Sequence, residues 1–170
     1  TYRGHAFYLA KGGELNAFFA ELYGKATGVA CGKAGSMHLF APEVGLMPAS
    51  AVVASTIPLA LGAARMEKRR GGDRLIVATF GDGATEEGVH HESLNLAAKF
   101  CLPVVFLCED NGYAVHASLS ERQAYRIADL PGRYGLETTE IGDGHDPERV
   151  FESFRVVADK TRRDRRPRYV

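Results

Sequence analysis

The chain has 170 residues, of which 45% are hydrophobic and 25% charged, as is ordinary for one globular domain. Its 21 basic and 21 acidic side chains give a formal net charge of zero, which argues against nucleic acid or anionic membrane as a partner. No run reaches the roughly 18 apolar residues that a membrane span requires. Three cysteines without zinc-ligand spacing suit a reducing compartment, so we expect a cytoplasmic protein. Residues 1–170 are expected to form a single domain, and the strand-like ending predicts a fragment of a longer subunit.

Helices are predicted where apolar residues recur at helical spacing. They fall in four segments: 14–23, 56–70, 85–100 and 147–160. Gly24 is expected to end the first helix, and the pair Gly71–Gly72 the second. We expect Thr85 to cap the third helix, which would have two glutamates in its first turn, and Asp146 to cap the fourth.

Two apolar runs bounded by turn residues, Leu75–Phe80 and Val104–Cys108, are predicted to be buried parallel strands. Because one helix lies between them, the strand–helix–strand segment forms one crossover unit. A shorter strand is expected at 136–141, and the glycine-rich stretches 24–36 and 142–144 are expected to be loops. The sequence therefore predicts an α/β fold with a parallel sheet flanked by helices.

Polar residues follow both strands directly. Asp82 lies between Gly81 and Gly83, and Asn111 follows the second strand. Carboxyl ends of neighbouring parallel strands meet at one edge, where ligands of open α/β sheets bind. A carboxylate, an amide oxygen and a backbone carbonyl just past Asn111 are hard oxygen ligands that suit Mg²⁺, while the glycines let the backbone approach a phosphate. A Gly-Asp-Gly triplet alone is a common turn sequence. Because Asn111 follows the neighbouring strand, one strand–helix–strand crossover later, the two motifs together favour a metal–phosphate site.

The two motifs together resemble the fingerprint of thiamine diphosphate enzymes, a GDG triplet followed after a helix and a strand by asparagine. Further stretches resemble the alpha subunit of pyruvate or acetoin dehydrogenases, the decarboxylating first component of the 2-oxo acid dehydrogenase family. These stretches are Tyr2–His5, Gly32–His38, Gly81–Thr85 and Leu102–Phe106. The resemblance runs from Tyr2 to Asp146. Branched-chain enzymes carry a GEG triplet and different residues at Gly35–His38, so that branch is disfavoured.

The resemblance implies a thiamine diphosphate-binding fold of the diphosphate-binding type. Asp82 and Asn111 would bind Mg²⁺ through their side chains, and Tyr113 through its carbonyl. The diphosphate would be approached by the N-terminal pair and by backbone N–H groups after Asp82, and the aminopyrimidine by the backbone of 51–54. The implied cofactor-binding residues are Tyr2, Arg3, Ala51, Val53, Asp82, Gly83, Ala84 and Asn111.

The implied function is decarboxylation of a small 2-oxo acid such as pyruvate, or cleavage of acetoin, with thiamine diphosphate as the electron sink. The activating glutamate is expected on a beta-type subunit that carries the pyrimidine-binding domain, so no catalytic residue is assigned within this chain. The alpha chain would be active only with that subunit, in a heterotetramer. The resemblance also allows a lipoyl-bearing acyltransferase as a further partner.

Four residues depart from the family's pattern: Asp110 and Glu86 stand where it usually has asparagine, and Ala51 and Ala54 where it commonly has glycine. Asp110 and Glu86 would add negative charge beside an anionic diphosphate. Two alternatives stay open, a transketolase-like enzyme that shares the Mg²⁺ motif and a non-catalytic assembly subunit that kept the fold. The motifs Tyr2–His5 and Gly35–His38 argue against the first.

Other candidate residues have a simpler interpretation. His90 and His91 are adjacent, so on a helix they point about 100° apart, and structural roles are favoured for both. His5 and His38 lie inside family-like motifs, which leaves a pocket role and a structural role equally open. The basic run 160–168 is expected to close a helix and to remain solvated.

Overall fold

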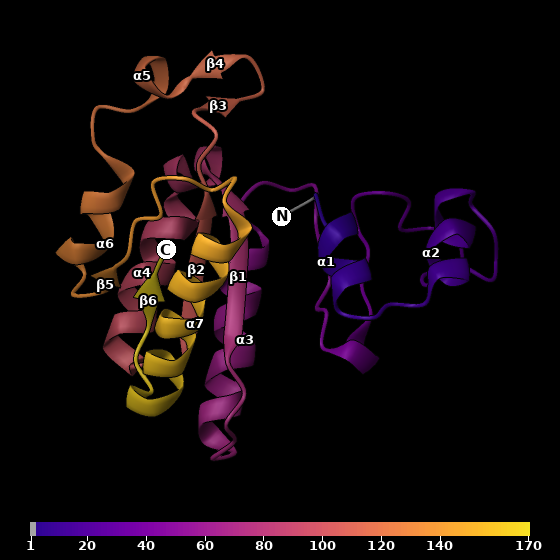
Figure 1. Ribbon diagram of the computed structural model, residues 1–170, viewed down its shortest axis with the longest axis horizontal. Helices are drawn as coiled ribbons and strands as arrows, with labels where there is room; N and C mark the ends of the chain where they lie inside the picture. Colours follow the sequence, from indigo (N-terminus) through magenta and orange to yellow (C-terminus); the bar gives the residue numbers. More distant parts are fainter. Residues whose placement is uncertain (1–2) are drawn as a thin grey trace. The chain divides into compact units, whose positions relative to one another are not determined.

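The predicted parallel sheet is present in the computed structural model, which describes residues 3–170. The sheet has four strands in the order β1-β2-β6-β5, and all three neighbouring pairs are parallel (Figure 1). The strands are β1 (Ile76–Gly81), β2 (Val104–Glu109), β5 (Glu137–Thr138) and β6 (Arg168–Tyr169). With helices flanking the sheet, the α/β prediction is confirmed.

The chain divides into two compact units, Thr1–Thr56 and Ile57–Val170, and the sheet lies in the second. The helices and the remaining strands of that unit are α3 (Thr56–Arg69), η2 (Asp82–Glu86), α4 (Gly88–Phe100), β3 (Tyr113–Ala114), β4 (Ala117–Ser118), α5 (Leu119–Arg122), η3 (Ile127–Asp129), α6 (Leu130–Arg133) and α7 (Pro147–Asp164). Among the residues from Arg3 onward, no helix combines the length and the apolar character that a membrane crossing needs.

The centre of the sheet is apolar because β2 is covered on both faces. Val104, Val105 and Phe106 are fully buried, and such a continuous apolar run is typical of parallel strands. The register of β1 and β2 runs from Ile76 opposite Val104 to Gly81 opposite Glu109. The two strands therefore end together, and the segments that follow them begin at the same edge of the sheet.

Of the two helix caps that the sequence predicts, one is confirmed and the other is wrong. Asp146 caps α7, because its carboxylate accepts from the backbone N–H groups of Glu148 and Arg149. Thr85 does not cap α4: the helix begins only at Gly88 and has no side-chain cap. The Thr85 hydroxyl instead donates to the Asp82 carbonyl within the 3-10 turn η2, so this prediction was wrong.

The basic run near the C-terminus is only partly solvated. Arg168 is 6% exposed and donates to the carboxylates of Glu137 and Asp164. Hydrogen bonds from Lys160 and Arg168 lower the pKa of Glu137 below its ordinary value, against the opposing effect of burial. The expectation of a fully solvated run was therefore wrong for Arg168, which joins β6 to β5 and to the end of α7.

The first unit contains α1 (His5–Ala10), α2 (Leu15–Leu22) and the short turn η1 (Pro42–Val44). Its buried core is a small cluster of Tyr8, Phe18, Leu39 and Ala41, in which the rings of Tyr8 and Phe18 stack 5.4 Å apart. Glu14 caps α2 by accepting from two backbone N–H groups. The predicted helix at 14–23 is thereby confirmed, whereas the six-residue α1 was not expected.

His90 lies in the core of the second unit and not at its surface. It is 0% exposed, its ring is 5.4 Å from that of Phe80, and its Nε2 is 3.4 Å from the Tyr169 hydroxyl. Burial, assisted by the neighbouring charge of His91 and opposed by a hydrogen bond with the Thr85 backbone, lowers the pKa of His90 from 6.5 to about 4. The structural role predicted for His90 agrees with this position, although the burial is deeper than expected.

The buried His90 predicts a loss of stability in acid. Because the folded chain holds His90 neutral while an unfolded chain protonates it, the free energy of unfolding should fall as the pH drops from 6.5 towards 4. The expected contribution over that window is about 3 kcal/mol. Denaturant unfolding at a series of pH values measures this. The free energy of unfolding should depend less steeply on pH in His90→Gln than in the wild type, whereas His145→Gln, in an exposed loop, should keep the wild-type slope. Equal slopes in all three proteins would contradict the assignment.

Candidate functional site

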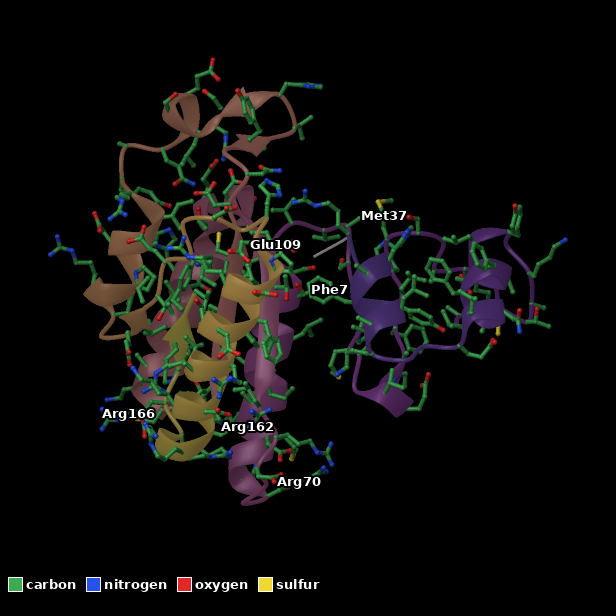
Figure 2. All side chains as sticks on the ribbon, in the orientation of Figure 1. Phe7, Met37, Arg70, Glu109, Arg162 and Arg166 are labelled. Atoms are coloured by element: carbon green, nitrogen blue, oxygen red, sulfur yellow. The ribbon has the colours of Figure 1, made fainter. Side chains whose placement is uncertain are left out.

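The carboxyl edge of the sheet brings together the residues that follow β1 and β2. Glu109, labelled in Figure 2, ends β2 opposite Gly81, and Asp82 begins η2 directly after β1. The hairpin of β3 and β4 lies beyond the strand ends, where β3 contacts η2 (Figure 1). A Cβ at Gly83 would come 2.9 Å from the Ala114 Cβ, so only glycine permits this approach.

The turn that leads into β3 is fixed by its own side chains. Asp110 Oδ1 accepts from the backbone N–H of Gly112 at 2.9 Å, and Asn111 Oδ1 accepts from that of Tyr113 at 3.0 Å. Gly112 has a φ of +76°, the left-handed region that glycine adopts without strain. Asp110 therefore has a structural partner, although the effect of its charge on a bound diphosphate remains a prediction.

Asp82 is buried and paired with a cation from a distant part of the sequence. Its side chain is 2% exposed, and its Oδ2 lies 2.5 Å from Nη2 of Arg122. The Nη1 group of Arg122 binds the Glu86 carboxylate, and its Nε donates to the Ala117 carbonyl at 3.1 Å. One guanidinium therefore joins both carboxylates of η2 to the hairpin.

Two neighbours of Arg122 strengthen this attachment. Gln123 donates from Nε2 to Thr85 Oγ1 at 2.7 Å and to Glu86 Oε1 at 3.0 Å, and the Tyr125 hydroxyl donates to the Thr85 carbonyl at 3.0 Å. A cavity of about 410 Å³ lies alongside. It is lined by Gly112, Tyr113, Ser118, Leu119, Ser120, Gln123 and Tyr125.

Sequence reasoning missed Arg122, Gln123 and Tyr125. Arg122 is 40 residues from Asp82, and it reaches the site from α5, a helix of four residues. Such short elements carry no periodic pattern. The one available signal was the capping box at the start of α5, in which Ser118 and Glu121 exchange hydrogen bonds.

The remaining predicted cofactor residues belong to the first unit. Tyr2 lies outside the described residues, Arg3 is exposed, Ala51 is half-buried and Val53 is 52% exposed. Ala54 has a φ of +60°, which is unusual for alanine. Asp82, Gly83, Ala84, Asn111 and Tyr113 all belong to the second unit, in which β3 contacts η2.

The motif Gly32–His38 of the first unit is held by a buried acid that the sequence analysis did not single out. Glu21 of α2 is 0% exposed, and its two carboxylate oxygens accept from the backbone N–H groups of Ala30, Gly32, Ala34 and Gly35 at 2.6–3.1 Å. Burial raises the pKa of Glu21, but these four donors outweigh it and keep the pKa below its ordinary value. The loop leads to Ser36, whose Oγ lies 2.8 Å from Nε2 of His5.

The donor set predicted at the sheet edge has the ligand chemistry that a hard divalent cation would require. It comprises the Asp82 carboxylate, the Asn111 amide oxygen and the Tyr113 carbonyl, all oxygen atoms, as Mg²⁺ prefers. One oxygen of that carboxylate, Asp82 Oδ2, is already paired with the Arg122 guanidinium. Groups of three or more His, Cys, Asp or Glu side chains able to hold a metal do not occur among residues 3–170, so any metal here would depend on this mixed set.

The chain is similar to known proteins of one family. The family described as "Dehydrogenase E1 component" matches residues 1–170. The alpha subunit of the acetoin:2,6-dichlorophenolindophenol oxidoreductase of Bacillus subtilis (strain 168) is 38% identical over 163 residues, 95% of this chain and 49% of that protein. The pyruvate dehydrogenase E1 component subunit alpha of Zymomonas mobilis is 35% identical over 159 residues, 93% of this chain and 45% of that protein. The chain thus spans about half the length of these curated relatives.

Proposed function

Because the chain belongs to the dehydrogenase E1 component family, we propose that it is the part of a 2-oxo acid dehydrogenase alpha subunit that holds thiamine diphosphate through Mg²⁺. The observation that carries the proposal is the convergence of Asp82 and Asn111 at the ends of two neighbouring parallel strands, since Gly81 and Glu109 are opposite each other in the register. That edge is where open α/β sheets bind ligands.

Each residue has a distinct task in this proposal. Asp82 and Asn111 supply side-chain oxygens to Mg²⁺, and Tyr113 supplies its carbonyl. Gly83 and Ala84 present backbone N–H groups to the diphosphate. When bound, thiamine diphosphate supplies the electron sink for loss of CO₂ from a 2-oxo acid. The chain's own contribution is to fix the diphosphate end and to exclude water from it.

In the first unit, we propose that Tyr2 and Arg3 reach the diphosphate and that the backbone around Ala51 and Val53 approaches the aminopyrimidine. The activating glutamate would come from a beta-type subunit with a pyrimidine-binding domain, in a heterotetramer. Turnover would thus require that subunit, and a lipoyl-bearing acyltransferase would accept the product. These assignments rest on the resemblance of the motifs.

A pyruvate-like 2-oxo acid is the proposed substrate. Acetoin is the second candidate, because the Bacillus subtilis and Cupriavidus necator relatives, each 38% identical to this chain, are alpha subunits of acetoin oxidoreductases. A substrate screen of the chain in complex with its beta subunit separates the two. The same screen with sugar phosphates tests the transketolase-like alternative.

Calorimetric titration tests the central proposal. Thiamine diphosphate should bind the subunit in the presence of Mg²⁺, and chelation of the metal should abolish binding. Thiamine without phosphates should bind far more weakly, because the proposed contacts are with the diphosphate. Absence of binding under all conditions would instead favour the non-catalytic assembly subunit.

A further inference from the structure

Arg122 is the residue whose position the metal and diphosphate assignments leave unexplained. Its side chain is only 10% exposed, yet it contacts two carboxylates within a single 3-10 turn, those of Asp82 and Glu86. A third contact, from Nε to the Ala117 carbonyl, fixes the direction from which the guanidinium enters. Because arginine presents planar, pre-organised donors, it can hold two carboxylates in a fixed relation.

The charge at this turn makes the arrangement significant for an anionic ligand. Asp82 and Glu86 alone would place two negative charges in the turn that is proposed to hold a diphosphate. Arg122 reduces that to one, and Mg²⁺ at Asp82 would then make the cluster positive by one charge. Without Arg122 the metal-loaded cluster would be neutral and would attract the diphosphate less.

We propose that Arg122 is a positioning residue of the cofactor site, which cancels the charge of Glu86 and holds the Asp82 carboxylate so that the metal-loaded turn attracts a diphosphate. This inference rests on the proposed function. It also explains why a glutamate is tolerated at position 86: the glutamate and the arginine form a compensating pair. Gln123 supports the pair, since it donates to Glu86 from the next position in the chain.

A double-mutant cycle at saturating Mg²⁺ tests the compensation. With the metal in place, the cluster charge would be +1 in the wild type, 0 in Arg122→Gln, +2 in Glu86→Gln and +1 again in the double variant, by the formal charges of the paired side chains. Affinity for thiamine diphosphate, measured by calorimetry, should fall about 10- to 100-fold in Arg122→Gln, as is typical when a partner of a metal-ligating carboxylate is removed. Glu86→Gln should bind at least as tightly as the wild type, and the double variant should recover most of the loss.

Two controls separate this role from a merely structural one. Arg126→Gln removes a nearby arginine whose partners, Asp129 and Glu140, lie outside the site, so it should leave the affinity unchanged. The loss in Arg122→Gln should also shrink at high salt, where charges are screened. The inference would be overturned if Arg122→Gln kept its affinity for thiamine diphosphate, or if the double variant bound more weakly than Arg122→Gln. Binding by the wild type would still leave the proposed function intact. Failure of the wild type itself to bind would remove both.

Discussion

Replacement of Asp82 with asparagine is expected to abolish Mg²⁺-dependent binding of thiamine diphosphate. Asp82 supplies the only full negative charge among the three proposed metal ligands, and an amide of the same size attracts a divalent cation far less. We expect affinity for the cofactor at a fixed Mg²⁺ concentration to fall by at least about 100-fold. This loss exceeds the one expected when a residue that only contacts a metal ligand is replaced. Titration calorimetry with and without metal measures this directly.

The fold should survive that substitution. Asp82 is buried, but Arg122 would keep its bond to Glu86, so we expect the free energy of unfolding to fall by only about 1–3 kcal/mol. Asp129→Asn, at an exposed ion pair with Arg126, is the matched control and should bind the cofactor normally. If Asp82→Asn binds thiamine diphosphate with wild-type affinity and metal dependence, Asp82 is not a ligand.

Replacement of Glu21 with glutamine is expected to unfold the loop at 30–35. The carboxylate accepts four backbone N–H groups, two on each oxygen. An amide nitrogen cannot accept, so two of these donors would lose their partner in a site that water does not reach. A buried donor left unpaired costs about 1–3 kcal/mol, so a total of about 3 kcal/mol or more is expected.

Hydrogen exchange provides the measurement. The amides of Ala30, Gly32, Ala34 and Gly35 should lose protection in Glu21→Gln, and the unfolding midpoint should fall. Glu43→Gln, at an exposed position of the same unit, should leave both unchanged. A second variant, Gly28→Ala, approaches the same site from the other side, because a Cβ there would lie 2.4 Å from Glu21 Oε2 and 2.6 Å from its Cα. Wild-type protection in Glu21→Gln would show that the carboxylate does not hold the loop.

Sequence patterns were sufficient to predict the sheet, the long helices and the shared edge of the sheet near which Asp82 and Asn111 lie. An apolar run such as Val104–Cys108 is stable as a strand only when both of its faces are buried. A single helix between this run and Leu75–Phe80 makes the two strands parallel neighbours. The family resemblance followed from motifs at the strand ends, and the comparisons confirmed it. These are local patterns, or patterns one crossover apart, and both are visible in a linear sequence.

The side chains that surround Asp82 and the loop at 30–35 could not be predicted in this way. Arg122 reaches Asp82 because a two-stranded hairpin and a four-residue helix fold back over η2, and neither is long enough to show a period. Glu21 accepts four N–H groups from a loop whose path depends on the left-handed conformations of Cys31, Gly32 and Gly35. His90 is buried because β6 places Tyr169 beside it, 79 residues away in the chain. In each case a polar or charged group is satisfied by partners that chain folding alone brings near, and sequence spacing carries no information about them.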